Sequence, residues 1–388
     1  MIALHEKSKC TGCTACAAAC PVHCISMERD NEGFLYPAID QNHCIQCGKC
    51  SRICPVERQE DATLPLYALG MNIKDENIRK RSSSGGVFYC LASHVLKQGG
   101  VVFGAAYDGH ALTVTHKYAA VQEDLGKMMG SKYVQSSLNN TFSLVKEQLE
   151  TGKQVLFSGT PCQISGLRAF LAKDYENLIN VSVICHGVPS PLLWDKYIEK
   201  RSTEMGEILS CDFRNKQRGW NHFGMKLISA TGKTKYLLAQ KDPYMRMFLS
   251  NLSLRPSCYR CGAKNNICKA DIVIGDFWGV EHRLPELADD KGTSLVLVYS
   301  QKGDALINLI SGQTVYSKVD SEKALLGNRA FSTSVNEPGL RSSLFADIER
   351  MNFDMLAGKY VPIRPKERVK LLLDSVGLLG LICRILGK

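Results

Sequence analysis

The sequence lacks a hydrophobic run long enough to cross a membrane. The uncharged stretch from Ser375 to Cys383 has nine residues, whereas a membrane-spanning helix needs about 20. The first residues, Met1 to Lys9, alternate polar and charged side chains and contain no apolar signal-peptide core. We therefore expect neither export nor a membrane span, and we predict a cytoplasmic protein.

Three common cofactor motifs are also missing. No G-x-G-x-x-G occurs, which argues against a plain dinucleotide-binding fingerprint. The triplet Gly232-Lys-Thr234 has Leu227 where a phosphate-binding loop requires glycine. The C-x3-C-x2-C pattern is absent, because Met27 stands where the third cysteine after Cys20 and Cys24 would be. Radical chemistry of the usual kind is therefore disfavoured.

Cysteine, by contrast, is abundant and unevenly placed. Of 17 cysteines, nine lie in the first 58 residues. Without an export signal, metal ligation explains this density better than disulfides do. The motif C-x2-C-x2-C-x3-C-P occurs twice, the second copy 34 residues after the first: Cys10, Cys13, Cys16, Cys20 and Pro21, then Cys44, Cys47, Cys50, Cys54 and Pro55.

This repeat is typical of ferredoxins with two [4Fe-4S] clusters, in which the cysteine before each proline binds the other cluster. The rule predicts a first quartet of Cys10, Cys13, Cys16 and Cys54, and a second quartet of Cys44, Cys47, Cys50 and Cys20. The alternative is a pair of zinc sites, although zinc usually takes two C-x2-C pairs. Cys24 is left over and is expected to be a small buried hydrophobe.

The rest of the chain alternates strand-like and helix-like segments, which predicts a mixed α/β or α+β fold. We predict three parts: a ferredoxin-like head at 1–58, a body at 66–345 and a helical tail at 346–388. The expected strands are Leu66–Met71, Val101–Tyr107, Val155–Ser158, Ile179–Cys185, Asp271–Gly275 and Ser294–Tyr299. The expected helices are Gly86–Lys97, Leu138–Thr151, Gln163–Ala172, Pro191–Arg201 and Pro243–Leu249.

Three features of the body carry chemistry. Ser82-Ser-Ser-Gly-Gly-Val87 opens an expected helix, where it is either an anion site or an ordinary serine cap. Cys258, Cys261 and Cys268 need a fourth ligand, for which Cys162 and Cys185 are candidates; a zinc knuckle is the alternative. Asp276 and Trp278 lie at the end of an apolar strand. They belong either to a functional site at the strand's end or to an ordinary turn after a buried strand.

Six segments follow one another in a recognisable order: Ser83–Gly86, Gly130–Ser136, Gly159–Gly166, Cys185–Gly187, the Cys258 set and Asp271–Gly279. In this they resemble the β-subunit family of coenzyme F420 hydrogenases and dehydrogenases. The similarity runs from about Leu66 to Phe277 and, more weakly, to about Leu340. With its ferredoxin-like head, the chain looks most like the members found in bacterial polysaccharide gene clusters.

The resemblance implies FAD and a third [4Fe-4S] cluster close to it. The flavin pyrophosphate would lie on Ser83, Ser84, Gly85 and Gly86, and the flavin pocket would be lined by Ser131, Lys132, Tyr133, Gly159, Thr160, Pro161 and Asp276. Lys132 is a candidate to stabilise the reduced flavin, and His186 is a candidate proton donor. Cys162 is the preferred fourth ligand of the third cluster, ahead of Cys185.

These expectations add up to an iron–sulfur flavoprotein oxidoreductase. Clusters pass single electrons and hydride carriers move two, so a flavin has to stand between them. Electrons would pass between a ferredoxin-type partner protein and a small-molecule substrate. The alternative is a non-catalytic relay subunit of a larger reductase or polysaccharide-biosynthesis complex.

Positive charge suggests two further contacts. The segment Phe213–Trp220 carries Arg214, Lys216 and Arg218, which suit an anionic substrate or a solvated loop. The segment Lys366–Lys388 has an apolar stripe flanked by basic residues, which suits a peripheral contact with the inner membrane surface or packing on protein. Despite a net charge of +10, no basic run with interleaved aromatics supports nucleic-acid binding.

Overall fold

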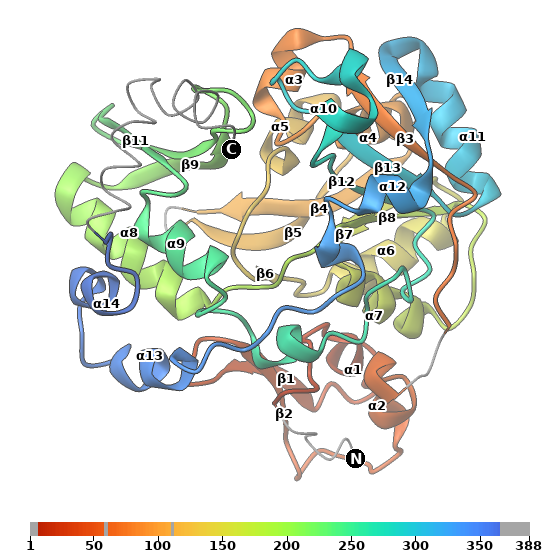
Figure 1. The fold of residues 1–388 in the computed structure, drawn as a ribbon. Coiled ribbons are helices and arrows are strands. Elements are labelled where there is room, and N and C mark those ends of the chain that lie inside the picture. Colours follow the sequence, from red (N-terminus) through yellow and green to blue (C-terminus); the bar gives the residue numbers. More distant parts are fainter. Residues whose placement is uncertain (1–6, 58–60, 110–111, 365–388) are drawn as a thin grey trace, which may run out of the picture.

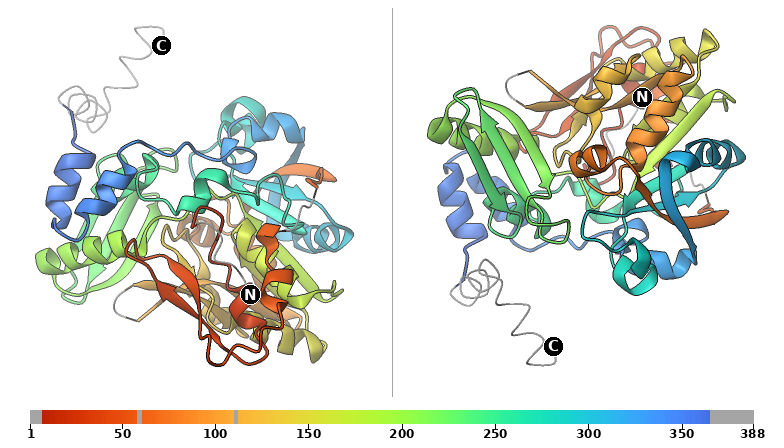
Figure 2. Two further views of the ribbon diagram at one scale, coloured as in Figure 1. Left: turned by 90° about the horizontal axis from the view of Figure 1, so that it is seen from below. Right: turned by 90° about the horizontal axis from the view of Figure 1, so that it is seen from above.

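The fold is described from a computed structural model, which covers residues 7–57, 61–109 and 112–364 (Figure 1). The head lies below the body in Figure 1 and is seen end-on in the left view of Figure 2. The predicted helix at Lys366–Lys388 lies outside the described residues. Within them, no helix is long and apolar enough to cross a membrane.

The head repeats its sequence motif in its backbone. The left-handed residues Gly12 and Thr14 of the first motif (φ 70° and 63°) correspond to Gln46 and Gly48 of the second (φ 54° and 68°). Each motif then forms one short helix. Between the motifs, two antiparallel strands pair, with Ile25 opposite Ile39. The head elements are α1 (Ala15–Ala18), β1 (Ile25–Arg29), β2 (Leu35–Ile39) and α2 (Lys49–Arg52).

A nine-stranded mixed sheet forms the centre of the body, in the order β14-β3-β13-β12-β8-β7-β4-β5-β6. Strands β12, β8, β7 and β4 are parallel, whereas β13, β3 and β14 continue the sheet antiparallel on one side. Its strands are β3 (Tyr67–Ile73), β4 (Val101–Asp108), β5 (Thr113–Ala119), β6 (Ser136–Ser137), β7 (Val155–Gly159), β8 (Leu178–Val183), β12 (Ile272–Asp276), β13 (Ser294–Val298) and β14 (Thr314–Val319).

Helices cover both faces of this sheet because its strands carry apolar residues on both sides. Val102 and Leu156 pack with α4 and α11 on one face, and Val101 and Val155 pack with α6 and α7 on the other. The helices around the sheet are α3 (Glu76–Arg81), α4 (Val87–Lys97), α5 (Leu125–Met128), α6 (Thr141–Glu150), α7 (Pro161–Leu171), α10 (Val280–Arg283), α11 (Gln301–Ile310) and α12 (Ser321–Leu325).

A second, three-stranded sheet in the order β11-β10-β9 was not predicted. Its core joins the rings of Trp194, Tyr197, Phe213 and Tyr244. The elements of this part are α8 (Pro191–Met205), β9 (Ile208–Asn215), β10 (Gly224–Ser229), β11 (Thr234–Leu238), α9 (Pro243–Leu249), α13 (Arg341–Asp347) and α14 (Phe353–Tyr360). The described start of the predicted tail therefore packs on the body, since Phe353 and Tyr360 belong to this core.

The predicted mixed α/β class is confirmed, and all six expected strands belong to the nine-stranded sheet. Near the site, the predicted ends of one helix and one strand were wrong. The helix expected from Gln163 begins at Pro161, which puts Cys162 in its first turn. The strand expected to reach Cys185 ends at Val183. Head and body also share a core, because Cys13 and Ala15 pack with Ile164 and Leu167.

Candidate functional site: a cavity bordered by cysteines

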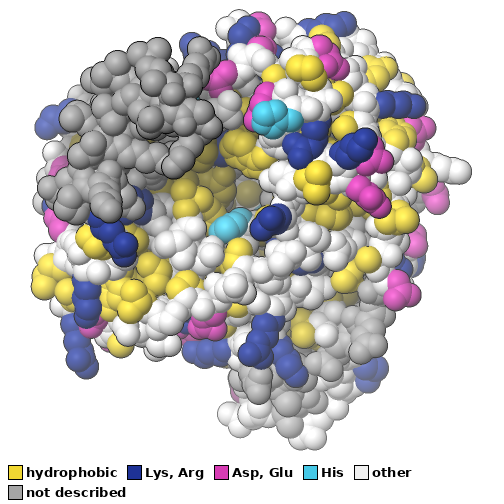
Figure 3. Space-filling view, viewed as in Figure 1, with side chains coloured by type: hydrophobic (Ala, Val, Ile, Leu, Met, Phe, Trp, Pro, Cys, Tyr) yellow, Lys and Arg dark blue, Asp and Glu magenta, His cyan; other side chains and the backbone are white. Residues whose placement is uncertain are grey.

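A cavity of about 850 Å³ opens where the large sheet, the small sheet and the head meet. It lies beyond the carboxyl ends of β7, β8 and β12, which is where parallel sheets usually bind ligands. Figure 3 shows the hollow on this face, with hydrophobic side chains inside it. Most of the predicted cofactor residues line it: Ser83, Ser84, Gly86, Ser131, Lys132, Tyr133, Gly159, Thr160 and Asp276. Gly85 and Pro161 lie just outside the lining.

The serine–glycine loop presents the open end of α4 to this cavity. Gly86 takes φ 88° at the start of the helix, and no side chain caps the first turn. The N–H groups of a first turn have no partner within their own helix. At position 85, glycine is required by packing rather than by an anion, because a Cβ there would lie 2.6 Å from the Asn72 side chain. This end of the cavity therefore suits an anion.

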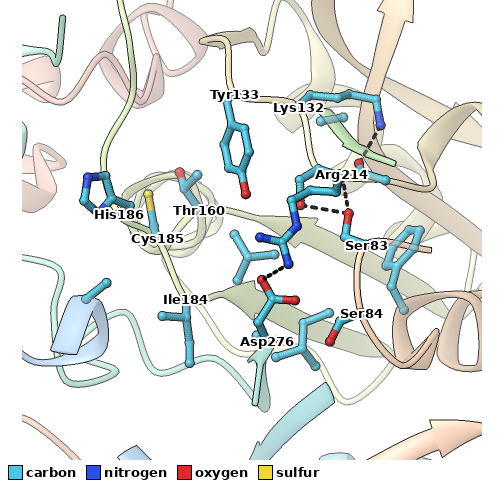
Figure 4. Close-up of a pocket in the computed structure, with 18 of the residues that line it drawn as sticks. Ser83, Ser84, Lys132, Tyr133, Thr160, Ile184, Cys185, His186, Arg214 and Asp276 are labelled. Atoms are coloured by element: carbon cyan, nitrogen blue, oxygen red, sulfur yellow. Dashed lines mark hydrogen bonds and ion pairs between the residues drawn. The ribbon is translucent and has the colours of Figure 1, made fainter. Parts of the chain in front are cut away.

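A second loop closes on the first. The Ser131 amide and hydroxyl donate to the Ser83 hydroxyl at 2.6 and 2.9 Å (Figure 4). Lys132 lines the cavity, but its ammonium donates to the carbonyls of Met128, Met129 and Gly130 at 3.0–3.2 Å. Burial lowers the pKa of Lys132 to about 8. In this position the Lys132 ammonium stabilises its own loop, and it can lose its proton slightly above neutral pH.

Arg214 and Asp276 form an ion pair inside the cavity (Figure 4). Arg214 Nη2 lies 3.0 Å from Asp276 Oδ2, and Trp220 Nε1 donates to Asp276 Oδ1 at 3.1 Å. Arg214 belongs to the basic segment predicted from the sequence. Of the other basic residues there, Lys216 donates to backbone carbonyls, including that of Ser84 at 2.7 Å. Only Arg214 of this segment lines the cavity, so it alone is placed to meet an anionic substrate.

Three histidines line the cavity, and two of them, the buried His116 and the partly buried His186, have lowered pKa values. His186 Nε2 lies 2.7 Å from Asn251 Oδ1, an acceptor, so that nitrogen carries the proton. Burial lowers the pKa of His186, and its predicted role as a proton donor stays a prediction. His116 was missed because its strand, β5, was not predicted. Its Nε2 faces the Ser158 carbonyl at 3.0 Å, and burial lowers its pKa to about 4.

In the head, the cysteines gather into the two predicted groups. One small cavity is lined by all four members of the first quartet, and another by all four members of the second quartet and Cys24. Burial, together with the nearby thiols of Cys10 and Cys54, raises the pKa of the Cys16 thiol to about 12. The cysteine before each proline is thus carried across to the other motif, as cluster ligation requires.

In the body, four cysteines from three distant segments gather beside the main cavity, and two of them, Cys162 and Cys185, line its wall. The pKa of Cys185 is raised by burial and by the nearby thiols of Cys258, Cys162 and Cys261. Burial likewise raises the pKa of Cys258 to about 12. We call Cys162, Cys185, Cys258 and Cys261 the body quartet. Cys268 lies deeper, with its thiol 3.4 Å from Asn266 Oδ1.

The cysteine groups are wider than a site for one ion. Among the residues that the structure describes, no three His, Cys, Asp or Glu side chains are close enough to hold a single metal ion. A four-iron cluster needs a wider spacing, because each cysteine binds a different iron. The gathered thiols therefore fit clusters better than the zinc sites considered as an alternative.

Two family models match the chain. Residues 9–57 match a 4Fe-4S dicluster domain, and residues 152–323 match the C terminus of the coenzyme F420 hydrogenase/dehydrogenase beta subunit. Residues 152–323 are thus similar to this β-subunit family. The resemblance inferred from the motifs is therefore confirmed, and so is the pair of [4Fe-4S] clusters in the head.

Similar proteins include an uncharacterized protein of Methanocaldococcus jannaschii, 23% identical over 82% of this chain and 91% of its own length. NADH-quinone oxidoreductase subunit I 2 of Geobacter metallireducens is 41% identical over 58 residues, 14% of this chain and 44% of that protein. A chain of the F420-reducing [NiFe] hydrogenase complex from Methanosarcina barkeri aligns with a TM-score of 0.47 and 17% identity, over 77% of this chain and 93% of that one. The protein is thus an iron–sulfur electron-transfer protein related to oxidoreductase subunits.

Proposed function

We propose that the protein is a flavin-dependent oxidoreductase that relays electrons between a one-electron carrier protein and a two-electron substrate. The observation that carries this proposal is the single cavity with two chemically different ends. The open α4 N-terminus and the serine–glycine loop lie at one end, and Cys162 and Cys185 of the body quartet line another part of the wall. A flavin suits this place because it exchanges both single electrons and electron pairs.

FAD fits the residues present. Its pyrophosphate would be held by the α4 N-terminus with Ser83 and Ser84, and Ser131 ties the second loop to the first. Arg214 and Tyr133 line the same cavity (Figure 4). When bound, FAD would supply the change from one-electron to two-electron transfer. The chain's own residues would hold and orient it and exclude water.

The body quartet is the proposed site of a third [4Fe-4S] cluster. The pKa values of Cys162, Cys185 and Cys258 are raised by burial and by other thiols of the quartet, which supports their closeness. This assignment takes Cys162 and Cys185 together, rather than one of them with Cys268. The first quartet is adjacent, because the Cys13 thiol also lies near Cys162. The cysteines therefore form a continuous series from the head to the cavity.

The first test is composition. We expect anaerobically purified protein to contain about twelve irons and one FAD per chain, from three four-iron clusters. Ser83→Asp should lower the FAD content at least tenfold by placing a negative charge beside the pyrophosphate, with the iron content unchanged. Ser83→Asn, of equal size and without charge, is the control. Eight irons and no flavin in the wild-type protein would contradict the proposal.

A relay subunit without its own substrate is the second candidate, and the β-subunit family of residues 152–323 favours it. The two are separated by turnover. An isolated chain that contains FAD and oxidises reduced ferredoxin with a diffusible acceptor is an enzyme. A chain whose flavin is reduced but turns over only with an added partner protein is a relay.

A further inference from the structure

Six cationic side chains are buried in the described part of the protein, and they form two groups. Four of them lie within ion-pair distance of a carboxylate: Arg79 with Asp289, Arg201 with Glu204, Arg214 with Asp276 and Arg341 with Glu32. The other two, Arg255 and Lys264, are only 1% and 8% exposed. Their polar contacts among the described residues are to carbonyl, amide and thiol groups.

Arg255 lies where the head meets the body. Its Nε donates to the Cys10 carbonyl at 2.8 Å and its Nη2 to the Leu35 carbonyl at 2.9 Å. Nη2 is also 3.7 Å from Cys10 Sγ, in the first quartet. On the other side, the Arg255 carbonyl accepts a hydrogen bond from the Cys258 amide at 2.9 Å. Arg255 therefore touches Cys10 of the first quartet and Cys258 of the body quartet.

Lys264 lies on the far side of the body quartet. Its ammonium donates to the Cys185 carbonyl at 2.8 Å and to the Ala330 carbonyl at 2.5 Å. The two buried cations without a carboxylate are thus the two that lie beside the body quartet.

We infer that Arg255 and Lys264 are the internal counter-charges of the iron–sulfur clusters, with Arg255 shared between the first quartet and the body quartet. A buried cation is strongly unfavourable without an opposite charge. Four thiolates exceed the charge of an oxidised four-iron core by about two, so each cluster leaves negative charge that a buried cation beside it offsets. The inference rests on the proposed function, which supplies that cluster.

The counter-charges act on the reduction potential. Net charge and hydrogen bonds near a cluster set its potential, and a nearby cation favours the more negative, reduced form. Arg255 and Lys264 therefore make their clusters easier to reduce. They are positioning residues, which act through the cysteine ligands and need not touch substrate.

The test compares Arg255→Gln and Lys264→Gln with Arg201→Gln in the full-length, anaerobically reconstituted protein. Arg201 is a matched control, because it is equally buried but pairs with Glu204 in the core of the small sheet. In redox titrations followed by electron paramagnetic resonance, Arg255→Gln should lower the reduced-to-oxidised ratio of two clusters at least tenfold, or about 59 mV for one electron. Lys264→Gln should do so for one cluster, and Arg255→Lys should restore the wild-type potentials.

A second readout needs no reduced clusters. Removing iron with a chelator leaves two unpaired buried cations in the wild-type protein, but none in the Arg255→Gln/Lys264→Gln double variant. The fall in Tm on iron removal should therefore be smaller in the double variant than in the wild type or in Arg201→Gln. Potentials and Tm changes equal to those of Arg201→Gln, in protein with full iron content, would overturn the inference alone. A wild-type protein with no third cluster would overturn the proposed function as well.

Discussion

The first quartet of the head lies against the body, whereas the second quartet faces outward. Cys13 is buried with Ile164 and Leu167 of α7, and Arg255 reaches Cys10. In the second quartet Cys47 is exposed, and the neighbouring Ile45 is 61% exposed. The same sequence motif thus forms an inner and an outer site. Under the proposed function, the first cluster would lie next to the body quartet, and the second would face a partner protein.

The largest effect is expected at the inner contact. A Cβ at Gly166 in α7 would lie 2.8 Å from Cys13 Cβ, so Gly166→Val should push the head away from the body. We expect a loss of about 3 kcal/mol of unfolding free energy, the upper range for overpacking. Gly358→Val in α14 is the control, because it shares the helical setting and its Cβ meets open space. Equal losses in urea unfolding would show that the inner contact is not tight.

Low pH should destabilise the folded protein through His116, which lines the cavity. Burial lowers the pKa of His116 from 6.5 to about 4, so between these pH values the unfolded chain binds more protons than the folded one. The free energy of unfolding should therefore fall as the pH drops, by about 2 kcal/mol between pH 7 and pH 5. Urea unfolding of His116→Gln should lose this dependence. His43→Gln, at an exposed histidine near the second quartet, should keep it.

The outer site should determine the exchange of electrons with a partner. Ile45→Glu places a charge on the exposed apolar surface beside Cys47, and we expect reduction by ferredoxin to slow about tenfold, or about 1.4 kcal/mol. Val315→Glu on β14 is the control, since Val315 is also an exposed hydrophobic residue but lies at the far edge of the sheet. Stopped-flow rates that fall equally in both variants would place the contact elsewhere.

The smallest effect is expected at Cys24, which lines the second cavity without belonging to a motif. Its thiol is buried 3.5 Å from the Cys20 thiol. Cys24→Ala should cost less than about 1 kcal/mol, because it removes one small buried atom. Iron analysis should still give two clusters in the head. A loss of four irons per chain would show that Cys24, and not Cys20, binds the second cluster.

Much of the site was predictable because its motifs are local. The serine–glycine loop, the Gly130–Ser136 loop and the residues after β7 and β12 all reach one cavity, since parallel strands end at the same edge of a sheet. His116 and the position of Arg214 were not predictable. They depend on β5 and on the small sheet, whose strands were not expected from the sequence.

The sequence by itself determined the head. Its cysteine spacing forces three sulfurs into each tight turn and leaves the fourth to cross over, so composition and repeat alone predicted both quartets. Only the tertiary structure decided the rest. The body quartet joins Cys162, Cys185 and the Cys258 pair across more than 90 residues. The order of the strands and the packing of the head on the body decide which cysteines meet there and which buried cations lie beside them. Neither can be predicted from the local spacing of residues.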